Sequence, residues 1–264
     1  MDKPEATSRT ASPGFSVLGI PGVPMVSPGD DLTAIIVDAL RDARITLEDG
    51  DIVCVAQKIV SKAEGRQIPL ASVTPSEEAQ TLAEETDKDP RLVELILRES
   101  SEVMRKKEGV LIVRHRLGLV GANAGIDQSN ISHEDGEQAL LLPEDPDRSA
   151  AELKSALDEA SGARVGVIIT DSANRPWRLG TVGIAIGCAG ISVLDDHRGG
   201  VDLFDRELKV TLISRADGIA GAATLVMGET TERIPVALVR GFPAEQSTDD
   251  ARMVCRPLHE DLFR

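Results

Sequence analysis

The sequence predicts an α+β protein with mixed or antiparallel sheets and flanking helices. Short runs of Val, Ile and Leu, bounded by Gly, Pro or Asp, predict strands, whereas other segments repeat apolar residues at helical spacing. These segments lack the regular strand and helix alternation of a doubly wound parallel sheet. Hydrophobic residues make up 41% of the 264 residues, enough to bury a substantial core.

The first elements are a short strand, a helix and a buried strand. The run "FSVLGI" (15–20) predicts the first strand. Apolar residues then recur at helical spacing from Leu32 to Ala43, with Asp30 or Asp31 as the N-cap. The segment "IVCVAQKIV" (52–60) predicts a second, buried strand.

Two helices and a strand follow. One helix is predicted from Pro75, with Ser76 and Glu77 in its first turn, and another from Pro90. The second helix is expected to place on one face Leu92, Leu95, Ile96 and Val103. The segment "GVLIVRHRLGL" then predicts a strand and turn, followed by the small and polar residues "GANAGIDQSNIS".

The second half mixes helices and strands. We expect helices in "DRSAAELKSALDEA" and "ADGIAGAATLVMG", and strands in "RVGVIIT", "RELKVTLIS" and "IPVALVRG". Residues 1–14 are polar and predict a disordered tail. Residues 15–264 are expected to form one domain of two lobes, with a boundary near 135–145.

Composition excludes several classes of protein. The net charge of −15 argues against a nucleic-acid partner, because phosphate binding needs clustered Lys and Arg. Cys54, Cys188 and Cys255 match no metal-binding spacing, which indicates a reducing compartment with Cys54 and Cys188 buried. Since no apolar run approaches the ~18 residues that span a bilayer, we expect a soluble cytoplasmic protein without membrane partners.

Two clusters offer oxygen ligands. Asp127 and Asn130 in "GIDQSN" could bind a hard cation and a phosphate, or Asp127 could cap an Asx turn. Asp171 and Ser172 follow a predicted strand and could hold Mg²⁺ near nucleotide phosphates, or cap a helix or turn. On spacing alone, the capping alternative is favoured for each.

Two further clusters are of interest. One contains a possible additional metal ligand, and the other contains three cationic side chains. Gly228 is best explained as a left-handed residue after a helix, which leaves Glu229 either solvated or a metal ligand. The cations Lys58, Lys62 and Arg66 suggest an anion site, with solvated lysines as the alternative.

Arg175 and Arg178 raise the same question of anion binding. Trp177 between them is expected to be a packing residue rather than a stacking platform for a base. The chain contains no standard nucleotide motif, and its four histidines are too dispersed to suggest a zinc site.

Read in order, these clusters resemble the coenzyme F420:L-glutamate ligase family, also called F420-0 gamma-glutamyl ligases. The resemblance runs from about residue 16 to the C-terminus. It rests on "GIPGVP" with "PGDDL", "VSKAEGR", "HRLG..GANAGIDQSNI", "GVIITDS..RPWRLG", "AIG.AGI", "DLF.RELKVT", "LVMGE....IPVALVRG" and "EDLFR". Each motif is weak alone, but eight in register are specific.

The resemblance implies GTP-dependent addition of L-glutamate to the lactyl carboxylate of F420-0, then of a second, gamma-linked glutamate, by an intertwined homodimer. It implies two Mg²⁺ or Mn²⁺ ions, with K⁺ assisting, held by Asp127 and Asp171 for one ion and Ser172 and Glu229 for the other. It places GTP against Ile20, Pro21, Gly22, Val23, Gln57, Lys58, Lys62, Asn130 and the segment from Met227 to Ile234, which includes Gly228, Glu229 and Thr230.

The expected mechanism is phosphoryl transfer from GTP to the acceptor carboxylate, followed by attack of the glutamate amine on the acyl phosphate. Lys58 and Lys62 are expected to stabilise phosphate oxygens, and Arg175 or Arg178 to hold the anionic substrate. We therefore assign catalytic roles to Lys62, Arg175 and Arg178. A ligase with another acceptor and a catalytically idle nucleotide-binding subunit are the alternatives.

Three positions depart from the family pattern. Ser172 replaces the usual Thr but keeps the hydroxyl, and Gln57 stands where relatives carry a small hydroxyl residue, which weakens its assignment to GTP. Leu179 stands where many relatives have a polar residue, which leaves substrate preference open. The sequence shows no counterpart of the flavin-binding reductase-like domain of some bacterial relatives, so ligase activity alone is expected. The number of glutamates and the strictness for GTP over ATP stay open.

Overall fold

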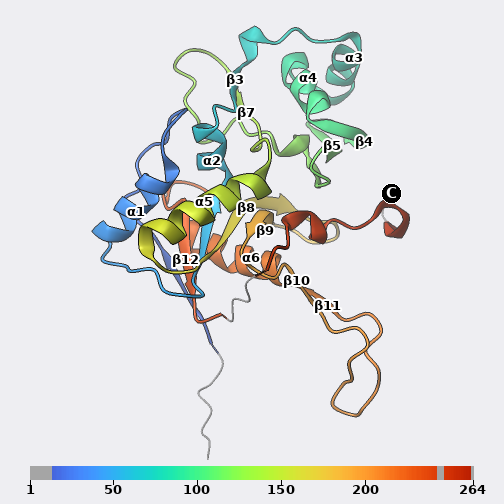
Figure 1. Cartoon of the computed structure of the whole chain (residues 1–264). Helices are drawn as coiled ribbons and strands as arrows, with labels where there is room; N and C mark the ends of the chain where they lie inside the picture. The colour runs from blue at the N-terminus through green and yellow to red at the C-terminus, as the bar shows by residue number, and fades with distance from the viewer. Residues whose placement is uncertain (1–13, 243–246, 263–264) are drawn as a thin grey trace, which may run out of the picture.

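The computed structural model describes residues 14–242 and 247–262, and its centre is a five-stranded sheet (Figure 1). The strand order is β1 (Ser16–Gly19), β12 (Val236–Arg240), β2 (Ile52–Ala56), β8 (Gly166–Asn174) and β9 (Thr181–Ala189). Strands β2 and β8 pair in parallel, and the other neighbours are antiparallel. The predicted α+β class with mixed and antiparallel sheets is confirmed.

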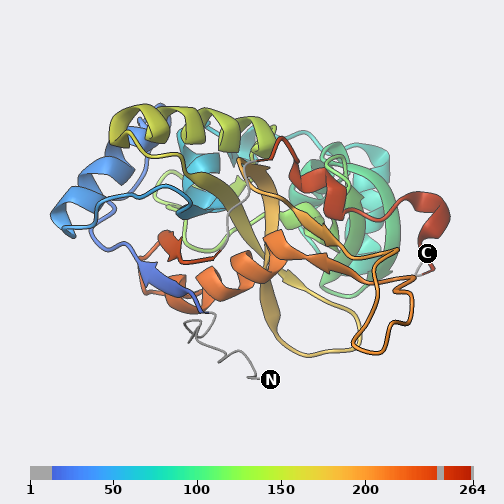
Figure 2. The same cartoon turned by 60° about the horizontal axis from the view of Figure 1, so that its bottom comes forward.

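Helices cover both faces of this sheet, α5 on one side and α6 on the other (Figure 2). The helices α1 (Leu32–Asp42), α2 (Gln57–Ala63) and α5 (Pro146–Ser161) pack on one face, and α6 (Arg215–Met227) packs on the opposite face. The buried side chains on each face form one apolar cluster. Val53 and Val55 of β2 belong to the first cluster, on the face of α1, α2 and α5, whereas Ile52 and Cys54 belong to the second, on the face of α6. The strand is a continuous apolar run because both of its faces are buried.

Polar side chains cap the starts of three helices, and the predicted cap at Asp31 is confirmed. Asp31 accepts the Ala34 N–H at 3.1 Å, whereas Ser76, expected in the first turn of its helix, instead caps α3 (Glu77–Thr86) by accepting the Ala79 N–H. Asp89 caps α4 (Pro90–Arg98), whose first residue is the predicted proline. Each cap satisfies a backbone donor that has no partner within its own helix.

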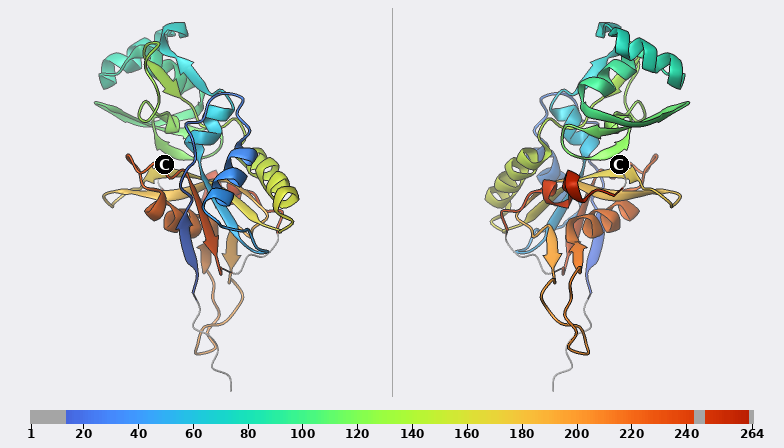
Figure 3. Two further views of the ribbon diagram at one scale, coloured as in Figure 1. Left: turned by 90° about the vertical axis from the view of Figure 1, so that its left-hand side faces the viewer. Right: turned by 90° about the vertical axis from the view of Figure 1, so that its right-hand side faces the viewer.

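Residues between α2 and α5 build a third apolar cluster beside the central sheet (Figure 3). Helices α3 and α4 pack there with the three-stranded sheet of β4 (Ser100–Lys107), β5 (Val110–His115) and β6 (Val120–Ala122). The pair β3 (Gln67–Pro69) and β7 (Gln138–Leu140) links this region to the rest. Short 3₁₀ turns at Leu70–Ser72 (η1) and Asn123–Gly125 (η2) complete it. The lobe boundary near 135–145 stays a prediction.

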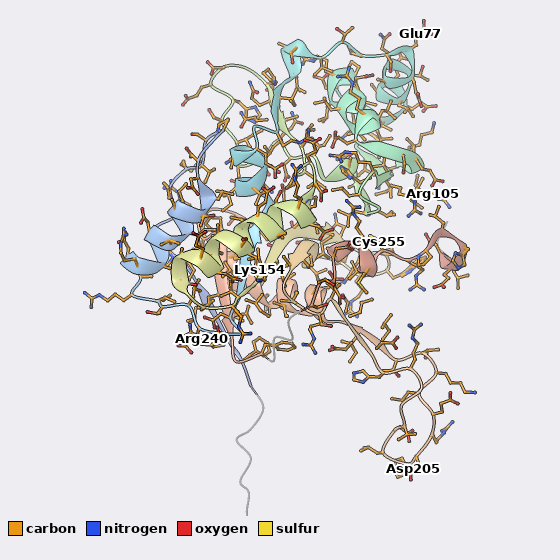
Figure 4. The ribbon with its side chains drawn as sticks, in the orientation of Figure 1. Glu77, Arg105, Lys154, Asp205, Arg240 and Cys255 are labelled. Atoms are coloured by element: carbon orange, nitrogen blue, oxygen red, sulfur yellow. The ribbon has the colours of Figure 1, made fainter. Side chains whose placement is uncertain are left out.

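A long hairpin projects from the body of the protein. Strands β10 (Leu194–Asp196) and β11 (Leu212–Ser214) pair at its base, and Asp205 lies at its far end (Figure 4). Two 3₁₀ turns, η3 (Ala251–Val254) and η4 (Leu258–Glu260), follow β12 near the end of the described residues.

Two predicted strands are wrong in extent. The strand expected over 52–60 ends at Ala56, and residues 57–63 are helical, because a short apolar run does not by itself distinguish strand from buried helix. The strand expected over 206–214 is restricted to Leu212–Ser214, since the preceding residues belong to the projecting connection.

Side-chain predictions give a mixed outcome. Val103 lies in β4, since helix α4 ends at Arg98, and Trp177 is 89% exposed at a hairpin tip, so its predicted packing role is wrong within this chain. Cys54 and Cys188 are buried as predicted. No helix among the described residues is long and apolar enough to cross a membrane. Apart from Gly14, the predicted tail lies outside the described residues.

Candidate active site

Four strands reach one edge of the central sheet. Because β2 and β8 are parallel, with Ala56 opposite Thr170, the carboxyl end of β2 lies there, followed by Gln57, while β8 continues past this point through Asp171 to Asn174. Strand β12 begins at this edge, where the Ala56 N–H donates to the Pro235 carbonyl, and β1 ends there. The edge thus gathers segments from four distant parts of the chain, as ligand sites in sheet proteins commonly do.

Asp171 and Ser172 lie within β8 rather than at a cap. They pair with Ile184 and Gly183 of β9, just after a register shift between Ile169 and Thr170. Bulges of this kind occur next to active sites, where they change the direction of the following side chains. The alternative stated above, that Asp171 or Ser172 caps a helix or turn, therefore does not apply.

Asp127 reaches the same edge from the other side. Its backbone is fixed by a pair of hydrogen bonds with Leu140, of 3.0 and 2.8 Å. Its carboxylate Oδ2 lies 2.6 Å from Lys58 Nζ and accepts from Gln57 Nε2 at 3.2 Å. The side chain thus bonds across the site to the first turn of α2 and does not cap an Asx turn.

Asp171 is held in an unfavourable environment for a charged carboxylate. Burial raises its pKa to about 7, and the carboxylates of Asp127 and Glu229 act in the same direction. The Ser172 N–H and the Lys58 ammonium oppose this rise without cancelling it. Asp127, Glu229 and Lys58 are therefore close enough to Asp171 to influence its pKa.

The two predicted lysines belong to this edge, but the third cation does not. Lys62 Nζ donates to the Asn130 carbonyl at 2.9 Å, and burial, with the nearby Lys58, lowers the pKa of Lys62. Arg66 instead bonds to Glu99 and to the Leu142 carbonyl. The prediction that Arg66 belongs to one group of cations with Lys58 and Lys62 is thus wrong. The charge of Arg66 is neutralised by Glu99 within the protein.

Gly228 and Glu229 follow α6 as predicted. Gly228 has φ 74° and ψ 176°, so its φ is positive although its ψ is not that of a left-handed helix. A Cβ at Gly228 would lie 2.2 Å from Glu232 Cδ and would displace that side chain, and the positive φ itself disfavours residues other than glycine. Glu232 also accepts from the Thr230 N–H and hydroxyl, which shapes the loop that carries the exposed Glu229.

Some predicted nucleotide contacts could come only from the backbone. The side chains of Ile20 and Met227 are buried in the apolar clusters. Pro21 and Gly22 are exposed and Val23 is half-buried, in the loop that follows β1. Gly22 has φ 85°, a conformation that favours glycine.

Arg175 and Arg178 lie beyond the edge, at the tip of the β8–β9 hairpin. Arg175 donates to the Gly180 carbonyl at 3.1 Å, and Arg178 is exposed, as are Trp177 and Leu179. The structure therefore does not bring these two predicted catalytic residues into the Asp127 and Asp171 group.

The oxygen donors suit a hard cation. Asp127, Asp171, Glu229 and the Ser172 hydroxyl are oxygen ligands, and a cation would relieve the mutual repulsion that raises the pKa of Asp171. Among the described residues, no three His, Cys, Asp or Glu side chains already form a metal cage. Proteins usually hold Mg²⁺ through one or two carboxylates together with substrate phosphates.

One feature of the edge escaped prediction from the sequence. The Gln57 amide is 2% exposed and accepts from the Ser61 hydroxyl at 3.0 Å. These residues are four apart, a spacing at which side chains meet on a helix but not on a strand. The spacing of four between Gln57 and Ser61 can be read from the sequence, but it was not recognised because a strand was predicted over 52–60.

A surface groove of about 540 Å³ lies elsewhere, between α3 and β4. It is lined by Glu78, Thr81, Leu82, Glu85, Val103, Met104, Arg105 and Lys106. None of these belongs to the edge, so the groove is not taken as the reaction site.

Comparison of the sequence with known proteins shows that the chain is similar to ligases. The sequence model described as F420-0:gamma-glutamyl ligase matches residues 22–241, and the chain belongs to this family. It is 45% identical over 253 residues to the coenzyme F420:L-glutamate ligase of Methanothermobacter thermautotrophicus, covering 95% of this chain and 99% of that one. The protein of the same name from Methanopyrus kandleri is 45% identical over 258 residues, again covering 95% and 99%. That from Methanocaldococcus jannaschii is 43% identical over 222 residues, covering 84% and 88%.

Proposed function

We propose that this protein joins L-glutamate to coenzyme F420-0 in a GTP-dependent reaction, as a step of F420 biosynthesis. The observation that carries the proposal is the meeting of Asp127, Asp171, Lys58 and Lys62 at one sheet edge in a member of this ligase family. The description of the family supplies the acceptor F420-0, and the names of the relatives supply L-glutamate.

GTP is proposed to bind along this edge. The loop 20–23, the first turns of α2, Asn130 and the segment 227–234 all border it. Lys58 and Lys62 supply local positive charge in a chain whose net charge is −15, which favours binding of the phosphates there.

Mg²⁺ or Mn²⁺ is proposed at the carboxylates, with Asp127 and Asp171 holding one ion and Ser172 and Glu229 a second. When bound, such ions neutralise charge on the phosphates during transfer. A role for K⁺ is carried over from the family resemblance.

The proposed chemistry has two steps. The acceptor carboxylate attacks the γ-phosphorus of GTP, which releases GDP and leaves an acyl phosphate. The glutamate amine then attacks the acyl carbon, forms the amide, loses a proton and expels inorganic phosphate. Lys58 and Lys62 bind phosphate oxygens, and the edge must exclude water, because water would hydrolyse the acyl phosphate. Arg175 and Arg178 are proposed to hold the anionic acceptor.

A homodimer is also proposed. The projecting hairpin presents exposed apolar side chains, and large exposed apolar patches mark interaction sites. These side chains are Val201, Leu203, Phe204, Val210, Leu212 and Ile213. Sedimentation velocity should give about twice the chain mass of 28.1 kDa, and a monomer at micromolar concentration would contradict the dimer.

The activity is tested by incubating the protein with GTP, Mg²⁺, L-glutamate and F420-0, and measuring product masses. We expect F420-0 to gain one or more glutamyl units, with GDP and phosphate released in equal amounts. Omission of GTP is the control for nucleotide dependence. Absence of any glutamyl product would contradict the proposal, whereas transfer to a different acceptor would support the alternative of a related amide ligase.

A further inference from the structure

We propose that Gln57 is a positioning residue for Asp127 and that Ser61 fixes its orientation. This chain of two hydrogen bonds runs from inside α2 to a carboxylate supplied by a distant loop. The inference rests on the proposed function in one respect: the carboxylate that is positioned is the proposed metal ligand.

The geometry of the two bonds supports this role. Gln57 is the first residue of α2, and its amide lies between two partners, with Nε2 3.2 Å from Asp127 Oδ2 and Oε1 3.0 Å from Ser61 Oγ. Ser61 is fully buried and Gln57 is 2% exposed. A side chain bonded at both ends in the interior is well placed to orient a neighbour and poorly placed to contact a nucleotide directly.

The donors and acceptors allow one orientation of the amide. An ionised Asp127 carboxylate only accepts hydrogen bonds, so the amide nitrogen must face it. The amide oxygen then faces Ser61, whose hydroxyl can donate to it. With the amide turned over, its oxygen would face a carboxylate oxygen and the repulsion would push Asp127 away. Ser61 therefore acts on Asp127 although it does not touch it.

Asp127 needs such restraint because the nearby carboxylate of Asp171, when ionised, repels it. Lys58 contributes attraction, but its long side chain can take many conformations, whereas the Gln57 amide is fixed by burial. Lys58 and Gln57 both bond to Oδ2, and among the contacts of the described residues Oδ1 has none. One carboxylate oxygen is thereby anchored while the other is left for a ligand.

The test measures Mn²⁺ binding to the protein with GDP by isothermal titration calorimetry, so that it does not depend on activity. Gln57→Met removes the amide at similar size, and Ser61→Ala removes only the hydroxyl that orients it. We expect each to weaken Mn²⁺ binding about 10-fold or more, the usual effect of losing a partner that orients a metal ligand. The apparent KM for Mn²⁺ should rise more than the KM for GTP.

Ser149→Ala is the matched control. Ser149 is also a buried serine, and its hydroxyl donates to the Glu64 carboxylate at 2.6 Å, away from Asp127. Its loss is expected to lower thermal stability as much as Ser61→Ala but to leave Mn²⁺ affinity unchanged. Should Gln57→Met not fold, Ser61→Ala carries the test alone.

The outcomes separate this inference from the proposed function. Unchanged Mn²⁺ affinity in both variants overturns the positioning role, while glutamyl transfer by the wild type leaves the function standing. Weakened Mn²⁺ binding in a protein that yields no glutamyl product supports the positioning role and contradicts the function. A wild type that binds no Mn²⁺ with GDP overturns the positioning of a metal ligand, whatever the product assay shows.

Discussion

Two carboxylates in this protein, Glu99 and Asp171, have surroundings of opposite charge, which shift their pKa values in opposite directions. Burial alone would raise the pKa of Glu99, but the His115 ring and the guanidinium groups of Arg66 and Arg116 outweigh it and lower the pKa to about 2. Arg66 lies 2.9 Å from Glu99 Oε2, and Arg116 3.3 Å. For Asp171, burial raises the pKa to about 7, and its neighbours Asp127 and Glu229 add to the rise.

The difference distinguishes a structural ion cluster from a binding site. Glu99 is neutralised by the protein itself, so its cluster is complete and joins α4, β5 and the segment after α2. Asp171 has negative neighbours and one opposing ammonium, so its charge is only partly compensated. Perturbed carboxylates of this second kind concentrate at functional sites.

The largest expected effect is loss of activity in Asp171→Asn. The change removes the charge that the proposed cation requires, and we expect glutamyl transfer, measured by product mass, to fall about 100-fold or more. The matched control is Asp147→Asn, another aspartate whose pKa is raised by burial, but one that accepts from the Cys188 and Ala251 N–H groups instead. Full activity in Asp171→Asn would refute the assignment.

The next effect is on stability, in Glu99→Gln. Removing this charge leaves Arg66 and Arg116 uncompensated in a partly buried cluster, and should lower the free energy of unfolding by about 2 kcal/mol at pH 7. Because the folded pKa is lowered, the contribution of Glu99 is present above its ordinary pKa of 4.5 and is lost as the pH falls toward about 2.

Urea unfolding of both proteins from pH 7 to pH 3 measures that contribution. The difference between wild type and Glu99→Gln should shrink as the pH falls. Glu85→Gln, which removes an exposed pair with Lys106, is the control and should change stability by less than about 0.5 kcal/mol. Equal effects of the two substitutions would mean that the Glu99 cluster is no more than a surface ion pair.

The smallest effect has the opposite pH dependence. The folded pKa of Asp171 is raised, so the protonated form favours folding at low pH, and this contribution is lost as the pH rises through about 7. In EDTA, Asp171→Asn should therefore exceed the wild type in unfolding free energy by at least about 1 kcal/mol at pH 8, and by less at pH 5. A constant difference at both pH values would show that Asp171 is solvated like an ordinary aspartate.

Much of the fold could be read from local patterns. The cap at Asp31 and the proline that starts α4 are signals within a few residues of the sequence, and both are confirmed. The strand expected over 52–60 failed because its apolar run continues into α2. Whether such a run stays extended depends on the partners across the sheet, and those come from distant parts of the chain.

The sequence allowed the types of residue in the candidate site to be predicted, but not their arrangement in space. Asp127 and Asp171 were selected as oxygen ligands, and their proximity is visible only once β2 and β8 pair in parallel. Arg66 was grouped with Lys58 and Lys62 by spacing, yet it bonds to Glu99, which no motif had marked. Trp177 was expected to pack, but the turn between β8 and β9 exposes it.

The sequence by itself determined the ligase family, the α+β class and the set of oxygen and ammonium groups available for chemistry, because these depend on residue identity and short spacing. Only the tertiary structure decided which carboxylate is neutralised and which is not. Charge interactions depend on distance and burial, and strand pairing sets both by bringing together residues as far apart in the chain as Lys58, Asp127 and Asp171.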